Sequence, residues 1–176
     1  MLLSQDELIA TLFRETDRAQ RMKTPLAVIL CRIDDPLLPG LLCKKRALRD
    51  SLPEIEQRIT RLLRCYDSLG QIREDEFALV LPGCTSFNDV SMAERLKLGV
   101  FGSPVILGGV EIGFTAHFGI AGSGGRSSLI VLRNAEQALQ SASRRCAGTI
   151  ERCTYDTETD AGLFLIPAIE QEDFPR

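Results

Sequence analysis

The sequence predicts an α/β fold of the α+β sandwich type, in which a central, mostly antiparallel sheet of five strands is flanked by helices. Three observations predict it. Segments with a helical spacing of apolar residues alternate with short strand-like runs along the chain. The run 26–33 is almost continuously apolar, which is typical of a strand buried on both faces. Two pairs of strand-like runs are joined by short turns, and such pairs favour antiparallel hairpins.

The first elements follow from capping and from the apolar pattern. A helix is predicted to begin at Ser4, because Glu7 stands three residues later and completes a capping box, and to continue to about Arg21. The buried strand 26–33 comes next. Residues 34–43 include two prolines and a glycine, so this segment should be irregular at least in part.

The middle of the chain predicts a helix followed by a hairpin. The helix is expected to start at residues 51–54, Ser-Leu-Pro-Glu, because proline is tolerated in a first helical turn. A weaker helical pattern over 41–50 predicts a separate short helix that meets it at an angle. Two strand-like arms, 68–72 and 77–81, then enclose a turn at 73–76.

The remaining elements are expected in the order helix, hairpin, helix and strand, at residues 87–100, 105–121, 127–145 and 149–155. The hairpin is predicted because Gly108 and Gly109 tolerate the positive φ of a tight turn. Its arms are residues 105–107 and 110–121.

The chain divides into a predicted domain, residues 1–155, and an acidic C-terminal tail, residues 156–176. The tail contains the apolar segment 162–169, Gly-Leu-Phe-Leu-Ile-Pro-Ala-Ile. One interpretation is that this segment packs on its own domain or pairs with a sheet edge. The other is that it docks on a partner protein, because exposed apolar patches usually mark interaction sites.

The charge of the chain is spread unevenly. The tail has six acidic residues and one arginine, so its net charge is −5. The rest of the chain has 20 basic and 18 acidic residues. This mild balance gives no electrostatic basis for binding DNA. An anionic ligand would have to be held by a few placed arginines.

Several further classes are excluded by composition. No apolar run approaches the roughly 18 residues of a membrane span, and the N-terminus lacks the pattern of a signal peptide. The six cysteines form no Cys-x-x-Cys pair, and the chain has a single histidine, His117, so a metal site is not expected. The cysteines are interpreted as reduced thiols of a cytoplasmic protein, and His117 as a structural residue.

Four phrases in order resemble the GGDEF family of diguanylate cyclases, whose fold is that of nucleotide cyclases. They are residues 24–30 (Thr-Pro-Leu-Ala-Val-Ile-Leu), 75–82 (Asp-Glu-Phe-Ala-Leu-Val-Leu-Pro), 93–96 (Ala-Glu-Arg-Leu) and 114–121 (Phe-Thr-Ala-His-Phe-Gly-Ile-Ala). The likeness covers about residues 6–155. The family's usual leading phrase, Asp-x-Leu-Thr-Gly-Leu-x-Asn-Arg, is absent, so an upstream sensor domain could precede this one.

The resemblance implies a degenerate active site. The family joins two GTP molecules with Mg²⁺ held by a strand aspartate and by an acidic residue of the signature, whereas here the strand position is Arg32. A guanidinium does not ligate a cation. The two signature glycines, which let the backbone approach the nucleotide, are replaced by Arg73 and Glu74, whose side chains should fill that space.

The signature therefore runs Arg73-Glu74-Asp75-Glu76-Phe77. Asp75 and Glu76 keep their carboxylates and are expected in a solvated hairpin turn. The residues that read guanine are replaced by Gly40 and Arg49, and the phosphate-binding lysine of the last helix by Ser143, with Arg144 and Arg145 close by. The resemblance thus predicts a pseudoenzyme with no catalytic residue and no metal or Mg²⁺ cofactor.

A second site of the family is kept. The resemblance implies that the pair Arg64 and Asp67, in an Arg-x-x-Asp pattern, and Arg95, in an Ala-Glu-Arg phrase, form the product-binding inhibitory site. The chemistry agrees, since arginines fork to phosphates or to a guanine edge and an aspartate accepts from guanine N–H groups. Cyclic di-GMP is therefore the predicted ligand. A relic surface ion pair is the competing interpretation.

The resulting hypothesis is a catalytically inactive signalling domain that binds cyclic di-GMP and acts through a homodimer or an unknown protein partner. The alternative is a ligand-free dimerisation or scaffold domain. A weak diguanylate cyclase, or a domain regulated by bound GTP, is a third hypothesis, and Arg32 and Arg73 argue against it. Thermal stability with and without the dinucleotide separates the first two, because a ligand of the folded state must raise it.

Overall fold

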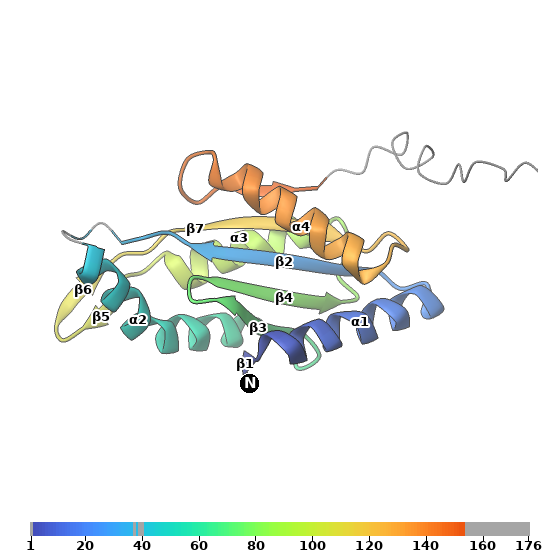
Figure 1. Cartoon of the computed structure of the whole chain (residues 1–176), viewed down its shortest axis with the longest axis horizontal. Helices are drawn as coiled ribbons and strands as arrows, with labels where there is room; N and C mark the ends of the chain where they lie inside the picture. Colours follow the sequence, from blue (N-terminus) through green and yellow to red (C-terminus); the bar gives the residue numbers. More distant parts are fainter. Residues whose placement is uncertain (1, 37, 39–40, 154–176) are drawn as a thin grey trace, which may run out of the picture.

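The structure is a computed structural model that describes residues 2–36, 38 and 41–153, and it is built around one six-stranded sheet with helices on both faces (Figure 1). The strands of this sheet are β1 (Leu2–Leu3), β2 (Leu26–Ile33), β3 (Ser68–Arg73), β4 (Glu76–Pro82), β7 (Ala116–Gly122) and β8 (Ile150–Arg152). The helices are α1 (Gln5–Met22), α2 (Leu41–Leu62), α3 (Asp89–Phe101) and α4 (Ser128–Ser143), and a separate hairpin consists of β5 (Val105–Leu107) and β6 (Val110–Ile112).

The sheet is mostly antiparallel, as predicted. Its order is β1-β3-β4-β2-β7-β8, with β2 at the centre between β4 and β7. The pairs β3–β4, β4–β2 and β2–β7 are antiparallel, and the outer pairs β1–β3 and β7–β8 are parallel. The predicted count of five strands was wrong, because β1 adds a sixth. With two residues, β1 is too short to show any alternation of apolar and polar side chains.

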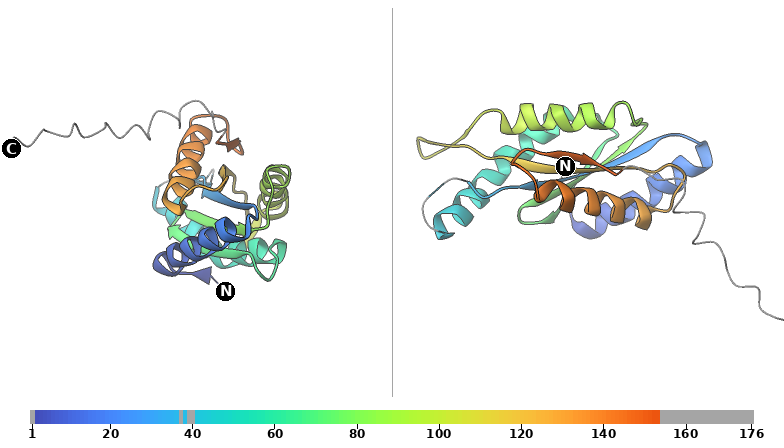
Figure 2. Two further views of the ribbon diagram at one scale, coloured as in Figure 1. Left: turned by 90° about the vertical axis from the view of Figure 1, so that its right-hand side faces the viewer. Right: turned by 90° about the horizontal axis from the view of Figure 1, so that it is seen from above.

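The two faces of the sheet carry different helices. Seen from above, α3 lies on one side of the sheet and α4 on the other (Figure 2). Side chains alternate along β2, so Ile29 and Cys31 join the core under α2 and α3, whereas Val28 and Leu30 join the core under α1 and α4. At Gly119 of β7 a side chain would collide with the backbone of α4, so this glycine lets helix and sheet approach closely.

Helix α1 begins as predicted. The Ser4 side chain accepts a hydrogen bond from the Glu7 N–H, and the Glu7 carboxylate accepts one from the Ser4 N–H at 2.9 Å. The Ser4 N–H and the Ser4 hydroxyl, which donates to the same carboxylate at 2.8 Å, hold the pKa of Glu7 below its ordinary value. The helix ends at Met22, and its C-cap Lys23 has a left-handed backbone with φ of 52° that turns the chain towards β2.

The predicted boundary between two helices at residues 51–54 was wrong. Helix α2 runs without a break from Leu41 to Leu62 and contains Pro53. Ser51 lies inside it, fully buried, and its hydroxyl has no hydrogen-bond partner, so it is not a cap. The helix continues because Leu48, before the proline, and Ile55, after it, are both buried in the same core. Burial of this face outweighs the hydrogen bond that proline removes.

The second hairpin is shorter than predicted. Residues 105–107 pair with 110–112 around Gly108 and Gly109, as expected, but the second arm does not continue to residue 121. The chain leaves the hairpin at residues 113–115 and enters β7, which pairs with β2 in the main sheet. The arm splits because β7 is buried on both faces, which a two-stranded ribbon does not provide.

The predicted domain end at residue 155 and the tail with its segment 162–169 lie outside the described residues. No helix in the described ranges has the length and apolarity to span a membrane. All six cysteines lie within these ranges as free thiols.

Candidate functional site

The candidate site residues lie at opposite ends of the central strands. The turn between β3 and β4, with the signature residues 73–77, stands beside the C-terminal end of β2, where Arg32 pairs in register with Glu76. The turn before β3, with Arg64 and Asp67, lies at the other end. The sheet therefore separates the signature residues from the Arg64 and Asp67 turn.

An ion pair occupies the end of β2. The Arg32 guanidinium donates from Nη2 and Nε to Glu76 Oε2, at 2.9 and 3.2 Å. Glu76 is only 4% exposed, so the expectation of a solvated position for this residue was wrong. The reason is its register, because Glu76 is the first residue of β4 and its side chain is covered by the cross-strand arginine.

Other replaced positions contact one another. Arg32 Nη1 donates to the Ser143 hydroxyl on α4 at 3.4 Å, and Arg49 on α2 donates to the Glu74 carboxylate at 3.3 Å. The side chains of Arg73 and Glu74 are both exposed. Four residues that the resemblance marked as replacements thus form side-chain hydrogen bonds at this end of the sheet: Arg32, Arg49, Glu74 and Ser143.

The His117 imidazole lies beside the carboxylate of an acidic residue, Asp34. Its Nε2 lies 3.1 Å from Asp34 Oδ1, and the other oxygen of Asp34 accepts a hydrogen bond from the Thr115 hydroxyl at 2.6 Å. His117 is 6% exposed, and its Nδ1 has no hydrogen-bond partner. No group of three or more His, Cys, Asp or Glu side chains within residues 2–36, 38 and 41–153 is arranged to hold a metal ion.

The three predicted ligand-binding residues line a single pocket. Arg64 follows α2, Asp67 precedes β3 and Arg95 projects from α3, and all three border a cavity of about 200 Å³. The β4–α3 loop at Gly83 and Cys84 forms another wall. The structure therefore brings together residues that are 31 positions apart in the sequence.

The Arg-x-x-Asp segment is held by its own turn. The Asp67 carboxylate accepts the Arg64 N–H at 2.8 Å, and the Arg64 carbonyl accepts the Asp67 N–H at 3.1 Å. Burial raises the pKa of Asp67, although the backbone hydrogen bond and the charge of Arg64 act in the opposite direction. The Asp67 carboxylate is thus a turn-forming group at the edge of the pocket.

Two residues near this pocket escaped the sequence analysis. The Arg64 Nη1 donates to the Tyr66 hydroxyl at 2.8 Å, and its guanidinium lies 5.7 Å from the centre of the Tyr66 ring. This contact raises the pKa of Arg64. Cys84 borders the cavity, and burial raises the pKa of its thiol, with Asp89 and Asp67 adding to the shift. Tyr66 could have been found as an aromatic residue inside the Arg-x-x-Asp motif, whereas nothing in the sequence marked Cys84.

Comparisons with known proteins agree on one family. The family model described as "Diguanylate cyclase, GGDEF domain" matches residues 50–148, more than half of the chain. No curated protein matches the chain. The GGDEF domain of YfiN, also called TpbB, from Pseudomonas aeruginosa has 21% identity and a TM-score of 0.73, and the match covers 88% of this chain and 98% of that one.

Two further solved structures were obtained as complexes. The GGDEF domain of DgcB from Caulobacter crescentus, in complex with c-di-GMP, is 15% identical with a TM-score of 0.70, over 88% of this chain and 90% of that one. The diguanylate cyclase SiaD from Pseudomonas aeruginosa, in complex with its activator SiaC, is 22% identical with a TM-score of 0.73, over 86% of this chain and 58% of that one. At these identities the likeness shows a shared fold.

Proposed function

The chain belongs to the GGDEF domain family of diguanylate cyclases, and we propose that it is a catalytically inactive member that binds cyclic di-GMP through Arg64, Asp67 and Arg95. It would pass the occupancy of this site to a second copy of itself or to a protein partner. The observation that carries the proposal is that these three side chains border one pocket, although they come from different elements of the fold.

The proposed loss of catalysis rests on the end of β2. Magnesium requires oxygen ligands free of competing cations, but Arg32 stands at the strand position and binds the Glu76 carboxylate at 2.9 Å. The donor set therefore does not fit the two-metal chemistry of the family, and no Mg²⁺ cofactor is proposed. The replaced residues are also bonded to one another through Arg32–Ser143 and Arg49–Glu74.

The chemistry of the second pocket suits a guanine nucleotide. The Arg64 and Arg95 guanidiniums can each fork to a phosphate or to the O6 and N7 atoms of guanine, and the Asp67 carboxylate can accept from N1–H and N2–H. A cavity of about 200 Å³ encloses only part of a dinucleotide. One guanine would enter the pocket, and the phosphates would lie against the arginines at its rim.

Neither arginine side chain forms an ion pair with Asp67 in the described part of the chain, so both can bind a ligand. Arg64 contacts Tyr66, and Asp67 accepts a backbone N–H instead. Within the described ranges, no hydrogen bond or ion pair engages the Arg95 side chain. These contacts disfavour the interpretation of a relic salt bridge, and the exposed Tyr66 ring offers a face on which a purine can stack.

Calorimetric titration of the full chain with cyclic di-GMP tests the proposal. Each charge-assisted hydrogen bond contributes roughly 1.5–3 kcal/mol, so two arginines and an aspartate support a Kd of about 1 μM. Arg64→Ala should weaken binding by about a hundredfold, because both its charge and its fork are lost.

The matched control is Arg61→Ala, an exposed arginine that lies three residues earlier and outside the pocket lining. It should leave the affinity unchanged. Equal affinity of wild type and Arg64→Ala would place the ligand elsewhere. If the wild type gave no heat of binding at high protein concentration, it would not be a receptor for cyclic di-GMP, and the scaffold function would remain as the explanation.

Binding should also depend on pH through Asp67. The carboxylate is the form that accepts guanine N–H groups, and burial raises its pKa above the ordinary 3.8. Affinity is therefore complete at neutral pH and should fall as the pH is lowered through this raised pKa. A raised folded-state pKa means that protonation of Asp67 favours the folded protein, so the loss would not reflect unfolding at this group. Asp67→Asn should bind more weakly and independently of pH over the same range; a wild-type affinity that does not fall as the Asp67 carboxylate is protonated would contradict its role.

A further inference from the structure

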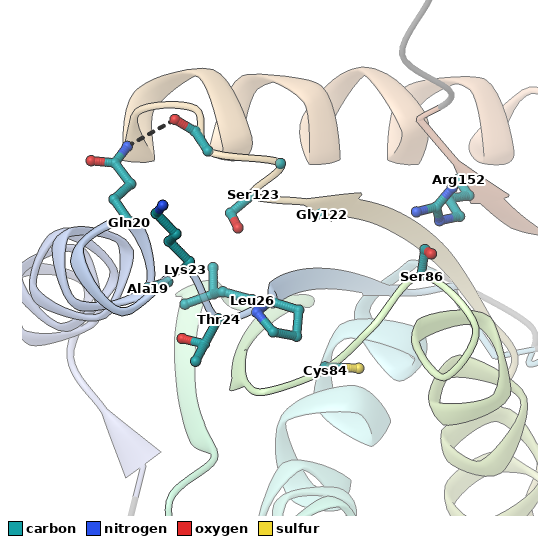
Figure 3. A pocket seen from close by; sticks show the side chains of 13 residues that line it. Ala19, Gln20, Lys23, Thr24, Leu26, Cys84, Ser86, Gly122, Ser123 and Arg152 are labelled. Atoms are coloured by element: carbon teal, nitrogen blue, oxygen red, sulfur yellow. Dashed lines mark hydrogen bonds between the residues drawn. The ribbon is translucent and has the colours of Figure 1, made fainter.

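A second pocket opens where α1 ends and β2 begins. It has a volume of about 580 Å³, within the roughly 300–1,000 Å³ of small-molecule sites. Its walls come from the end of α1, the start of β2, the β4–α3 loop, the turn after β7, and β8 (Figure 3). Of the described residues, Cys84 alone also lines the pocket of Arg64 and Asp67.

Two basic side chains line this pocket. Among the described residues the lining includes Lys23 and Arg152 and no aspartate or glutamate, although the charge of Arg152 is paired with Asp89 outside the lining. Arg152 is fixed in place because its Nε donates to the buried Asp89 carboxylate at 2.8 Å. This bond uses Nε, so the two Nη groups remain to reach the pocket, and Nη2 lies beside Gly122. A ligand here would meet one fixed guanidinium and one exposed ammonium.

Ser123 supplies a buried polar group that faces the hollow. The residue is 4% exposed, and within the described part of the chain no hydrogen bond engages its hydroxyl. Figure 3 shows its oxygen directed into the pocket. The hydroxyl can therefore donate a hydrogen bond to an acceptor in the pocket.

The turn that carries Ser123 leads into a helix N-terminus. Gly124 and Gly125 both have positive φ, which a side chain at these positions would oppose. The Gln20 amide donates to the Gly125 carbonyl at 3.1 Å and ties the turn to α1.

We propose that this pocket is a binding site for a phosphate-bearing small molecule. The phosphate lies between Lys23 and the Ser123 hydroxyl, and Arg152 faces it from the other side of the hollow (Figure 3). The organic part lies against the apolar wall of Ala19 and Leu26. The site is separate from the cyclic di-GMP site and does not depend on it.

The test is ¹H–¹⁵N NMR of the full chain with inorganic phosphate and, separately, with AMP. Sodium chloride at matched ionic strength is the control for screening. We expect saturable shifts of the Gly122, Ser123 and Gly125 amides, with a Kd of about 1 mM or tighter. Tighter binding of AMP would mean that the organic part is recognised, and equal binding would mean that the phosphate alone is; both support the site. Absence of saturable shifts with either probe would overturn it.

Two variants make the test specific. Ser123→Ala should weaken binding about fivefold without destabilising the free protein, because the hydroxyl has no partner there. Lys23→Asn removes the ammonium while asparagine tolerates the left-handed backbone, and it should weaken binding about tenfold. Unchanged affinity in both variants would overturn the placement.

Two further variants separate this site from its alternatives. Arg64→Ala lies outside the lining and should leave phosphate binding intact, so failure of the cyclic di-GMP proposal would not affect this result. The acidic residues 156, 158 and 160 follow closely after Arg152 in the sequence. If Asp156→Asn/Glu158→Gln/Asp160→Asn moved the same glycine amides without any probe, the tail would be the occupant and the proposal would be overturned.

Discussion

Replacing Arg32 with alanine is expected to lower the free energy of unfolding by about 2–3 kcal/mol, because the Glu76 carboxylate loses its partner while water can enter only from the partly exposed side of Arg32. Glu76 is 4% exposed, and its Oε2 accepts both hydrogen bonds of the Arg32 fork. The loss would be seen as a lower midpoint in urea denaturation at pH 7 with an unchanged slope.

A double replacement distinguishes the effect of the unpaired charge from the effect of lost packing. Arg32→Met/Glu76→Leu removes both charges at similar volume, and it should be close to neutral or stabilising, because apolar replacement of a buried ion pair avoids its desolvation penalty. If the double variant were as unstable as Arg32→Ala, the effect would come from packing rather than from the unpaired carboxylate. Arg49→Ala is the surface control, because the Arg49–Glu74 pair is exposed on both sides and should contribute less than about 1 kcal/mol.

Replacing Arg58 with alanine is expected to destabilise the protein by about 2–4 kcal/mol, because several charge-assisted hydrogen bonds to backbone are lost. Its guanidinium donates to the carbonyls of Val100, Ser103 and Pro104 at 3.0, 2.7 and 2.9 Å, and it pairs with Glu54 at 3.0 Å. The Val100 carbonyl belongs to the last turn of α3, where carbonyls lack helical partners. Arg58 thus ties α2 to the end of α3.

The matched control on the same helix is Arg46→Ala. Arg46 also pairs with an acidic residue four positions away, Asp50, but its side chain is 86% exposed, so the change should be below about 0.5 kcal/mol. Arg58→Lys should recover only part of the loss, since an ammonium does not reproduce the planar fork. Thermal unfolding of the three variants measures whether their stabilities fall in this order. Equal stability of Arg58→Ala and Arg46→Ala would show that the carbonyl contacts contribute nothing.

Local signals predicted most of the fold. The capping box at Ser4, the apolar run 26–33 and the Gly108–Gly109 turn each specify an element within a few residues, and the structure confirms all three. The errors lie where tertiary contacts override a local rule. Pro53 predicts a helix start, but burial on both sides of it keeps α2 continuous.

By itself, the sequence determined the family, the order of helices and strands along the chain, and the positions of the signature and of the Arg-x-x-Asp pair. These are local patterns, and a local pattern is set by neighbours in the chain. Only the tertiary structure decided that Glu76 is buried under Arg32 and that Arg95 borders the pocket of Arg64. It also decided that Lys23, Ser123 and Arg152 face one hollow. The reason is physical, because burial and charge pairing depend on strand register and helix packing, which join residues that the sequence holds far apart.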